Sequence, residues 1–548
     1  MLVRRDFLLP GRLGREPVVA ECCGDCAGFE SRHGPRASAK FLGRTASEPP
    51  GFHPVPGPVL VTTSTCWLAL ASALQPLQGV PEKLDLASLE PKTWSVLDAR
   101  RTGSTGPFDP DPVRHAIFGS RSPGVEDGFI SWQQQDTDAS GQVCGPLSYA
   151  ATTVLAESEA VVFIRAAGAA VLFVNGEPLM GDPLHREGLG VPVLLRQGGN
   201  TILVSGVESA FRVHFRWPPG RLVIPEWGVR APGVTPEFDS WFFKDAFFPI
   251  VNASTVRTDY LHLHYGPVVL PHEEPVITDW MDGPLRIEPL AMAERSTYVS
   301  ARDRVGRAGW SEAYLPVQVY EFETGGDRSG SDVRRAPRTL LRIPLPDRRH
   351  DEAASLRRDV WDRPGLSSQL ASSPIALIYG TGGGLEVTRE LLARARFDQQ
   401  VIWYYGGYAP PLLSDLQAAA GHLGGGRAPL RDHDLVLYGN WDTNRCYSLV
   451  LDGSCPVQVE NGTVAVGARR FERPDLAVWF VWERADVEGA GKVICLGDTW
   501  RAGSRVGGAL SPFWPGQQLE EYSVFAADFL ASGPDAVLAS GSILDLAR

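Results

Sequence analysis

The chain has 548 residues, of which 43% are hydrophobic, and its formal net charge is −12. This length exceeds that of one ordinary domain, and the 58 Gly and 44 Pro favour many turns and much β structure. An acidic chain does not match a general nucleic-acid-binding protein, which needs clustered Lys and Arg. Only five of the 52 basic residues are Lys, a bias that indicates a GC-rich bacterial coding sequence.

The first 80 residues contain a segment that is typical of a secretory signal. Residues 59–75 are uncharged, too short and too polar for a stable membrane span, and they contain Ala71-Ser72-Ala73 as a cleavage site. The sequence therefore predicts a secreted or periplasmic protein. Residues 1–58 are interpreted as disordered or as a stretch upstream of the true start. The alternative is a short buried segment of a cytoplasmic protein.

Residues 81–220 are predicted to form a β-sandwich module. Asn175-Gly176 lies between apolar runs, which is the strongest short hairpin signal. The predicted strands are 160–165, 170–174, 191–195 and 201–205.

Two short motifs of this module resemble the jelly-roll modules attached to secreted glycan-active enzymes. They are VNG at 174–176, and Leu195 followed by GGN at 198–200. The resemblance implies either a glycan or polymer ligand or a module that only packs beside another domain.

A second β-sandwich module is predicted at 221–345, followed by a polar linker at 346–370. His262 and His264 lie on one face of a predicted strand, as in two-histidine metal sites, and His272, Glu273 and Glu274 could add a ligand. The alternative is a polar outer face. No cofactor is expected.

Residues 371–548 are predicted to form a parallel α/β module. A glycine-rich loop (GTGGG, 380–384) joins the first strand to a helix predicted at 385–396. Near-continuous apolar runs alternating with helices are typical of buried parallel strands. The predicted strands are 375–379, 401–405, 435–438, 476–483 and 492–500, and another helix is predicted from 522.

Polar residues follow three of these strands, at the edge where open parallel sheets bind ligands. If the site is catalytic, Asp442 and Asp498 are the candidate acid and base, because paired carboxylates can divide those roles. Alternatively, the polar residues at 440–444 only satisfy a turn. The candidate ligand-binding residues are Thr381, Gly382, Asn440, Asp442, Asn444 and Asp498.

The glycine loop matches no phosphate-binding or hydrolase motif in full. It lacks the last glycine of G-x-G-x-x-G and the lysine of a P-loop, and the chain contains no G-x-S-x-G nucleophile elbow. A structural strand-to-helix turn is the leading interpretation. Farther along, Cys446 and Cys455 could pair across a hairpin or remain buried thiols.

Four segments of the C-terminal region together resemble the C-terminal region of large secreted bacterial α/β-hydrolases of the prolyl oligopeptidase type. In that family a serine-hydrolase domain stands between β modules and this region, whereas this chain has only the 346–370 linker there. No catalytic triad can therefore be carried over. The segments are YGTGG (379–383), LARARFD (392–398), LYGNWDTN (437–444) and CPV (455–457).

This resemblance implies a secreted, hydrolase-related accessory or binding protein that lacks a serine-hydrolase triad, and the jelly-roll resemblance adds a possible glycan or polymer ligand. The alternative is a hydrolase that uses the strand-end crevice of the C-terminal module. The sequence does not predict an oligomeric state.

Overall fold

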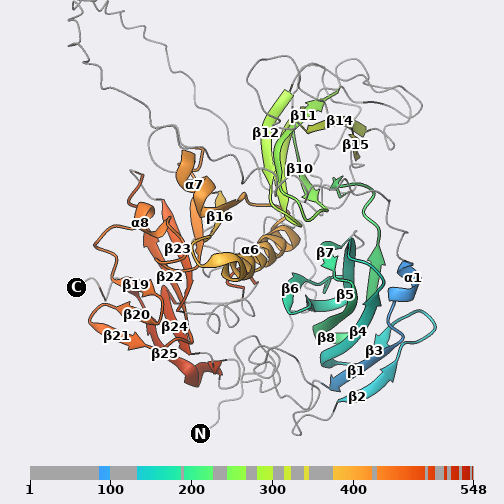
Figure 1. Ribbon diagram of the computed structural model, residues 1–548, viewed down its shortest axis with the longest axis horizontal. Coiled ribbons are helices and arrows are strands. Elements are labelled where there is room, and N and C mark those ends of the chain that lie inside the picture. Colours follow the sequence, from blue (N-terminus) through green and yellow to red (C-terminus); the bar gives the residue numbers. More distant parts are fainter. Residues whose placement is uncertain are drawn as a thin grey trace, which may run out of the picture. The chain divides into compact units, whose positions relative to one another are not determined.

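The protein is β-rich and contains several sheets (Figure 1). The predicted N-terminal segment and linker lie outside the described residues, and the predicted domain boundaries remain predictions. The computed structural model describes residues 85–98, 132–186, 190–225, 244–266, 269, 281–299, 314–321, 339–344, 374–421, 429–487, 491–499, 511–514, 520–526, 528–529, 533–543 and 546.

The first β region is an eight-stranded antiparallel sheet in the order β2-β1-β4-β8-β5-β6, with β3 on β8 and β7 on β5. The predicted break in β5 is wrong, because a β-bulge at Gly168 (φ 84°) keeps one strand continuous. The elements are α1 Leu86–Leu89, β1 Thr93–Asp98, β2 Gln133–Asp136, β3 Val143–Cys144, β4 Leu147–Ala156, β5 Ala160–Val174, β6 Glu177–Met180, β7 Val191–Leu195 and β8 Gly198–Arg216.

The Asn175-Gly176 hairpin is confirmed as the β5–β6 turn, with both residues at positive φ. Asn175 Nδ2 donates to Oδ1 of Asn200 at 2.8 Å, and Oδ1 of Asn175 accepts from the Thr201 N–H at 3.1 Å. The VNG and GGN motifs therefore stabilise each other across the sheet.

The second β region has two antiparallel sheets, β13-β10-β9 and β12-β11-β14-β15. Phe248 of β10 packs edge-on against Tyr265 of β11 at 6.2 Å, so side chains of both sheets share a core. The strands are β9 Leu222–Val223, β10 Lys244–Asn252, β11 Thr258–Tyr265, β12 Met281–Ile287, β13 Met292–Val299, β14 Tyr314–Glu321 and β15 Thr339–Pro344.

The C-terminal region contains a seven-stranded sheet in the order β17-β16-β18-β23-β22-β24-β25. Its first four strands are parallel and the other three pair antiparallel. The strands are β16 Ile375–Tyr379, β17 Leu412–Ser414, β18 Asp434–Tyr438, β22 Leu476–Glu483, β23 Lys492–Asp498, β24 Tyr522–Ala526 and β25 Val537–Gly541, accompanied by helices α7 Asp415–Gly421 and α8 Tyr447–Val450 and the 3₁₀ helix η3 Gly533–Ala536.

A small antiparallel sheet, absent from the sequence predictions, joins α8 to β22. Its first turn contains Asn461-Gly462, the same hairpin signal that marks β5–β6. The strands are β19 Val457–Glu460, β20 Thr463–Val466 and β21 Arg469–Glu472.

Two secondary-structure predictions in this region are wrong. The predicted strand 401–405 is the last part of helix α6 (Gly384–Gly406), which ends where Gly407 adopts φ 66° and donates to the Trp403 carbonyl. The segment predicted as a helix from 522 begins with strand β24, whose five residues are all buried. Both segments are apolar on all sides, which removes the periodicity that separates helix from strand.

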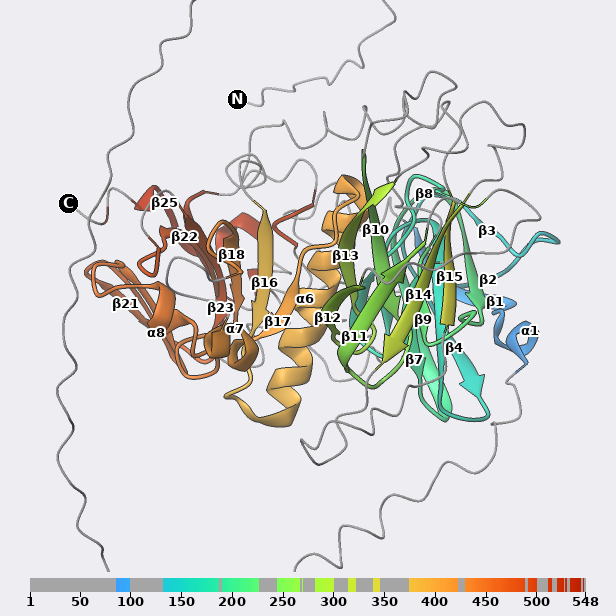
Figure 2. The ribbon, with the colours of Figure 1, turned by 90° about the horizontal axis from the view of Figure 1, so that it is seen from above.

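Helix α6 is buried on two sides, between the seven-stranded sheet and the β regions (Figure 2). Gln400 Oε1 accepts from the Met180 N–H at the end of β6 at 3.0 Å. Gln399 accepts from the Met292 N–H and donates to the Met292 and Pro410 carbonyls. These buried amides satisfy the backbone of strand ends, so one helix fixes the relative position of both β regions.

Candidate functional site

The glycine loop before α6 is filled by the protein itself. A Cβ at Gly380 would collide with the Thr443 carbonyl, and one at Gly382 would lie 2.7 Å from the Asp442 carbonyl oxygen. The Gly382 N–H donates to the Thr443 carbonyl at 2.7 Å. The loop is therefore a close backbone packing against the 440–444 turn rather than an open cradle for an anion.

The side chains of Asn440 and Asn444 are buried and hold the turn after β18. Asn444 Nδ2 donates to the carbonyls of Ile378 and Tyr438 at 3.1 and 2.9 Å, and Oδ1 accepts from the Cys446 N–H. The Asn440 amide oxygen accepts from backbone N–H groups of the turn, and its Nδ2 donates to the Asp498 carbonyl at 2.8 Å. Both side-chain amides thus act as the alternative interpretation of the sequence states, by forming hydrogen bonds to backbone groups of a turn.

The two more accessible members of the predicted set also have local partners. Thr381 Oγ1 donates to Oδ1 of Asp415 at 2.6 Å, and Oδ2 of the exposed Asp442 accepts from the Asn461 N–H at 2.8 Å. The structure thus brings the predicted residues to one edge of the sheet but engages most of their polar atoms there. Whether they bind a ligand stays a prediction.

Asp498 differs from its neighbours, because its Oδ2 atom is buried and has no hydrogen-bond partner within the described residues. Burial raises the pKa of Asp498 to about 7, against the opposing effect of the nearby Arg394 guanidinium. Arg394 is also buried, and its Nε and Nη2 atoms have no hydrogen-bond partner there either. Burial likewise raises the pKa of Asp398 to about 6, although it accepts from the Tyr438 hydroxyl.

His262 and His264 lie on β11 opposite Tyr320 and Gln318 of β14, on one strand face as predicted. Within the described residues no group of three or more His, Cys, Asp and Glu side chains is arranged to hold a metal ion. The other predicted ligands, at 272–274, lie outside those residues. Cys446 and Cys455 are both buried free thiols, so the possible disulfide between them is not formed.

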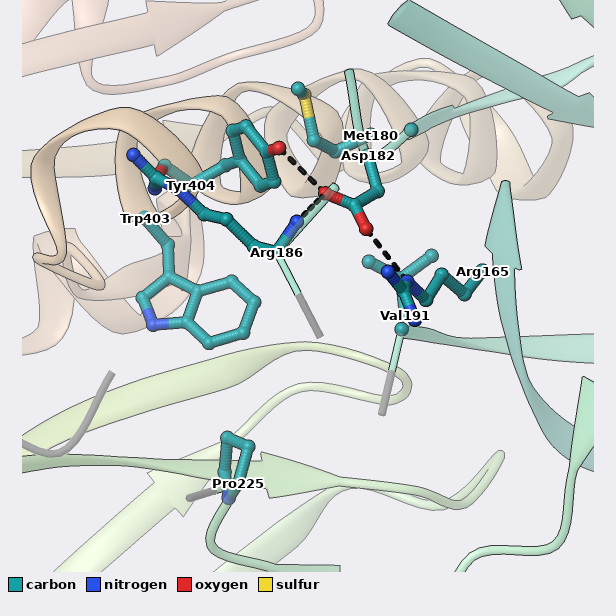
Figure 3. Close-up of a pocket in the computed structure, with 10 residues that line it drawn as sticks. Arg165, Met180, Asp182, Arg186, Val191, Pro225, Trp403 and Tyr404 are labelled. Atoms are coloured by element: carbon teal, nitrogen blue, oxygen red, sulfur yellow. Dashed lines mark hydrogen bonds and ion pairs between the residues drawn. The ribbon is translucent and has the colours of Figure 1, made fainter. Parts of the chain in front are cut away.

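A pocket lies where the β5–β7 segment meets the C-terminal end of α6 (Figure 3). Its volume, including the open mouth, is about 460 Å³. Apolar and aromatic groups form most of its wall. The lining residues are Arg165, Met180, Gly181, Asp182, Arg186, Gly190, Val191, Pro225, Trp403 and Tyr404.

Asp182 is the polar centre of this pocket (Figure 3). Its Oδ1 atom accepts from the Tyr404 hydroxyl and from the Arg186 N–H, each at 2.7 Å, and its Oδ2 atom pairs with Nε of Arg165 at 2.7 Å. The Arg186 guanidinium lies over the Tyr404 ring, 4.7 Å from its centroid, and donates to the Tyr404 carbonyl. Burial, followed by the Asp182 hydrogen bond, raises the pKa of the Tyr404 phenol, which therefore stays a donor.

Sequence reasoning missed this pocket because its parts come from distant segments. Asp182 and Tyr404 are 222 positions apart, and neither belongs to a motif. The available signal was the concentration of polar residues, RARFDQQ, ahead of an apolar run in one helix. Polar side chains on a helix that is also strongly apolar indicate contacts with more than one partner surface.

No family model matches the chain, and no curated protein matches it. Similar solved structures include a β-glucuronidase from Bacteroides uniformis, at 7% identity and TM-score 0.23, covering 67% of this chain and 54% of that one. An exo-chitosanase from Amycolatopsis orientalis has 9% identity and TM-score 0.21, with 64% and 49% covered. The chain spans about half the length of these two structures.

A third similar structure is a GH2 β-galacturonidase from Eisenbergiella tayi, at 9% identity and TM-score 0.23, with 65% of this chain and 64% of that chain covered. TM-scores this low assign neither fold nor function. None of the described helices is long and apolar enough to cross a bilayer.

Proposed function

We propose that this chain is a secreted, hydrolase-related accessory protein that binds a carbohydrate or another polar polymer and does not act as a serine hydrolase. The pocket at Asp182 carries this proposal. Aromatic and apolar walls offer a surface for the C–H face of a sugar ring, and a few fixed polar groups orient the ring. A carboxylate held by three donors is preorganised, which reduces the entropy lost on binding.

We also propose that residues 371–548 form an α/β module related to the C-terminal region of prolyl-oligopeptidase-type hydrolases. Four parallel strands and the buried helix α6 support this assignment. The closed glycine loop supports a non-catalytic role, because an oxyanion site needs backbone N–H groups that point into free space.

Two measurements on the purified protein test the proposal. Fluorophosphonate probes label only a serine activated by a neighbouring base, so we expect no stoichiometric labelling. A glycan array should give binding that Tyr404→Phe weakens, since this variant keeps the ring but removes the hydrogen bond to Asp182. Labelling of one serine would overturn the non-catalytic role, and an array without any binding would overturn the carbohydrate ligand.

A second candidate function, a hydrolase at the strand ends, is favoured by Asp498. A buried carboxyl with a pKa of about 7 and an unpartnered oxygen is suited to general acid–base chemistry at neutral pH. A screen of ester, peptide and glycoside substrates compares the native protein with Asp498→Asn. Turnover that this variant abolishes, without a loss of melting temperature, would favour the hydrolase over the binding protein.

A further inference from the structure

We propose that the pocket binds an acidic sugar, and that the Nη edge of Arg165 holds the sugar's carboxylate. This inference rests on the proposed function, since it assigns a ligand class to the same pocket. Three observations carry it: the free edge of one guanidinium, the positive charge around it, and the apolar walls beside it.

Arg165 is held in place at one end and left free at the other. Its Nε atom pairs with Oδ2 of Asp182 at 2.7 Å, and this is its one hydrogen bond within the described residues. The side chain is 15% exposed, and it lines the pocket. The two Nη groups are therefore available, in a fixed plane, to donate two parallel hydrogen bonds to a carboxylate.

Positive charge dominates around this guanidinium. The pocket wall carries two guanidinium groups, from Arg165 and Arg186, against one carboxylate. Across the sheet Arg165 is paired with His214 of β8, and Arg212 lies two positions along the same strand. Burial and then the charge of Arg212 lower the pKa of His214, whereas Glu90, which lies 3.6 Å from His214, raises it; Arg165 lowers it with the smallest effect. A carboxylate would relieve this repulsion, whereas a neutral ligand would not.

The remaining wall suits a ring rather than a small inorganic anion. Met180, Val191 and Pro225 provide apolar surface, and Trp403 adds an indole (Figure 3). The Asp182 carboxylate lies beside the guanidinium, and its Oδ2 atom, which accepts one hydrogen bond, retains acceptor capacity for a sugar hydroxyl group.

Nonspecific attraction does not explain such binding, because the chain has a net charge of −12 and repels polyanions as a whole. Affinity for an acidic oligosaccharide thus reports a local site. The matched ligand pair is oligogalacturonate and the same oligomer after carboxyl reduction, which keeps the ring and removes the charge. A second pair, made from oligoglucuronate, tests whether the ring's stereochemistry matters.

The test is calorimetric titration of the full chain with both ligand pairs. We expect the acidic oligomer to bind at least tenfold more tightly than its reduced form. Arg165→Met should remove at least tenfold of that affinity, and Arg165→Lys, which keeps the charge but not the planar fork, should remove part of it. Arg470→Met is the control. Arg470 lies on β21 with its side chain 63% exposed, and the substitution removes the same single positive charge as Arg165→Met.

The outcomes separate the two proposals. Equal binding of acidic and reduced oligomers would overturn this inference and leave the carbohydrate-binding function standing. If none of the four oligomers binds, both the carbohydrate-binding function and the acidic-sugar site at Arg165 are overturned for these sugar classes. Equal losses in Arg165→Met and Arg470→Met would show an effect of overall charge and overturn the inference. If Arg165→Met fails to fold, Arg165→Lys decides the question. Native affinity of this variant for the acidic oligomer would show that the two Nη groups are not needed and would overturn the inference.

Discussion

The strand ends of the C-terminal sheet and the pocket beside α6 both contain clusters of polar residues, but they differ in how many of the hydrogen-bonding groups are already paired within the protein. At the strand ends, two buried asparagines make six hydrogen bonds to backbone groups, and a carbonyl occupies the space beside each of two loop glycines. In the pocket, Asp182 accepts three hydrogen bonds, but the Arg165 guanidinium that it holds lines the pocket, and its Nη groups have no hydrogen-bond partner within the described residues. A cluster of polar residues is available to a ligand only where the protein leaves some of their hydrogen-bonding capacity unused.

Among the variants proposed here, a substitution of Asn444 should cause the largest loss in the free energy of unfolding. Asn444→Ala would remove three hydrogen bonds from a buried turn, two to the Ile378 and Tyr438 carbonyls and one from the Cys446 N–H. We expect a loss of about 4 kcal/mol in the free energy of unfolding. Gln458→Ala, at an exposed position of β19, should change it by less than about 0.5 kcal/mol. Equal stability of the two variants in urea unfolding would contradict the structural role of the turn.

The glycine loop gives the next largest expected effect. Gly380→Ala places a methyl group against the Thr443 carbonyl, so we expect a loss of about 3 kcal/mol through overpacking. Gly453→Ala meets nothing within 4 Å and serves as the control, with an expected change below about 0.5 kcal/mol. Denaturant midpoints measure both. A Gly380→Ala protein of native stability would mean that the loop is open and available to a ligand.

Asp498 gives a pH-dependent contrast with these satisfied groups. Its folded pKa of about 7 lies above the unfolded value, so the folded state binds more protons between about pH 4 and 7. Stability is therefore highest below the unfolded pKa and falls as pH rises towards 7. The stability advantage of Asp498→Asn over the native protein should grow by about 2.5 kcal/mol between pH 5 and pH 8.

Comparing the two proteins at each pH cancels the contributions of His214 and His433, whose pKa values burial lowers. Parallel stability curves for the native protein and Asp498→Asn, measured from pH 5 to 8, would show that the carboxyl is solvated. That result would also remove the basis for acid–base chemistry at this residue.

Much of the strand pattern was predictable from the sequence. The runs at 375–379, 476–483 and 191–195 are strands with those bounds, and the β5–β6 hairpin lies at its Asn-Gly signal. The predictions for these segments were correct because burial and turn residues leave a pattern within a few neighbouring positions of the sequence. Helix α6 was predicted ten residues too short at its C-terminal end because the run VIWYY is apolar throughout and carries no periodicity.

The site was less predictable than the fold. Sequence order indicated that Thr381, Asn440 and Asp498 would come to one sheet edge, but it could not indicate which backbone groups fill their hydrogen bonds. The pocket could not be predicted from the sequence, because Arg165 and Asp182 come close to Tyr404 only when helix α6 packs on the β5–β7 segment. Tertiary docking of this kind leaves no local pattern.

One paired titration tests the central claim most directly. Arg165→Met removes the free guanidinium of the pocket, and Asp442→Asn alters the exposed carboxylate at the strand ends while keeping an oxygen for the Asn461 N–H. Arg165→Met leaves Oδ2 of the buried Asp182 without its ion-pair partner and should lower the melting temperature, whereas Asp442→Asn should not, so affinities are compared at a temperature where both variants are folded. We predict that oligogalacturonate affinity falls at least tenfold in Arg165→Met and is unchanged in Asp442→Asn. The reverse pattern would place the binding site at the strand ends and contradict the account.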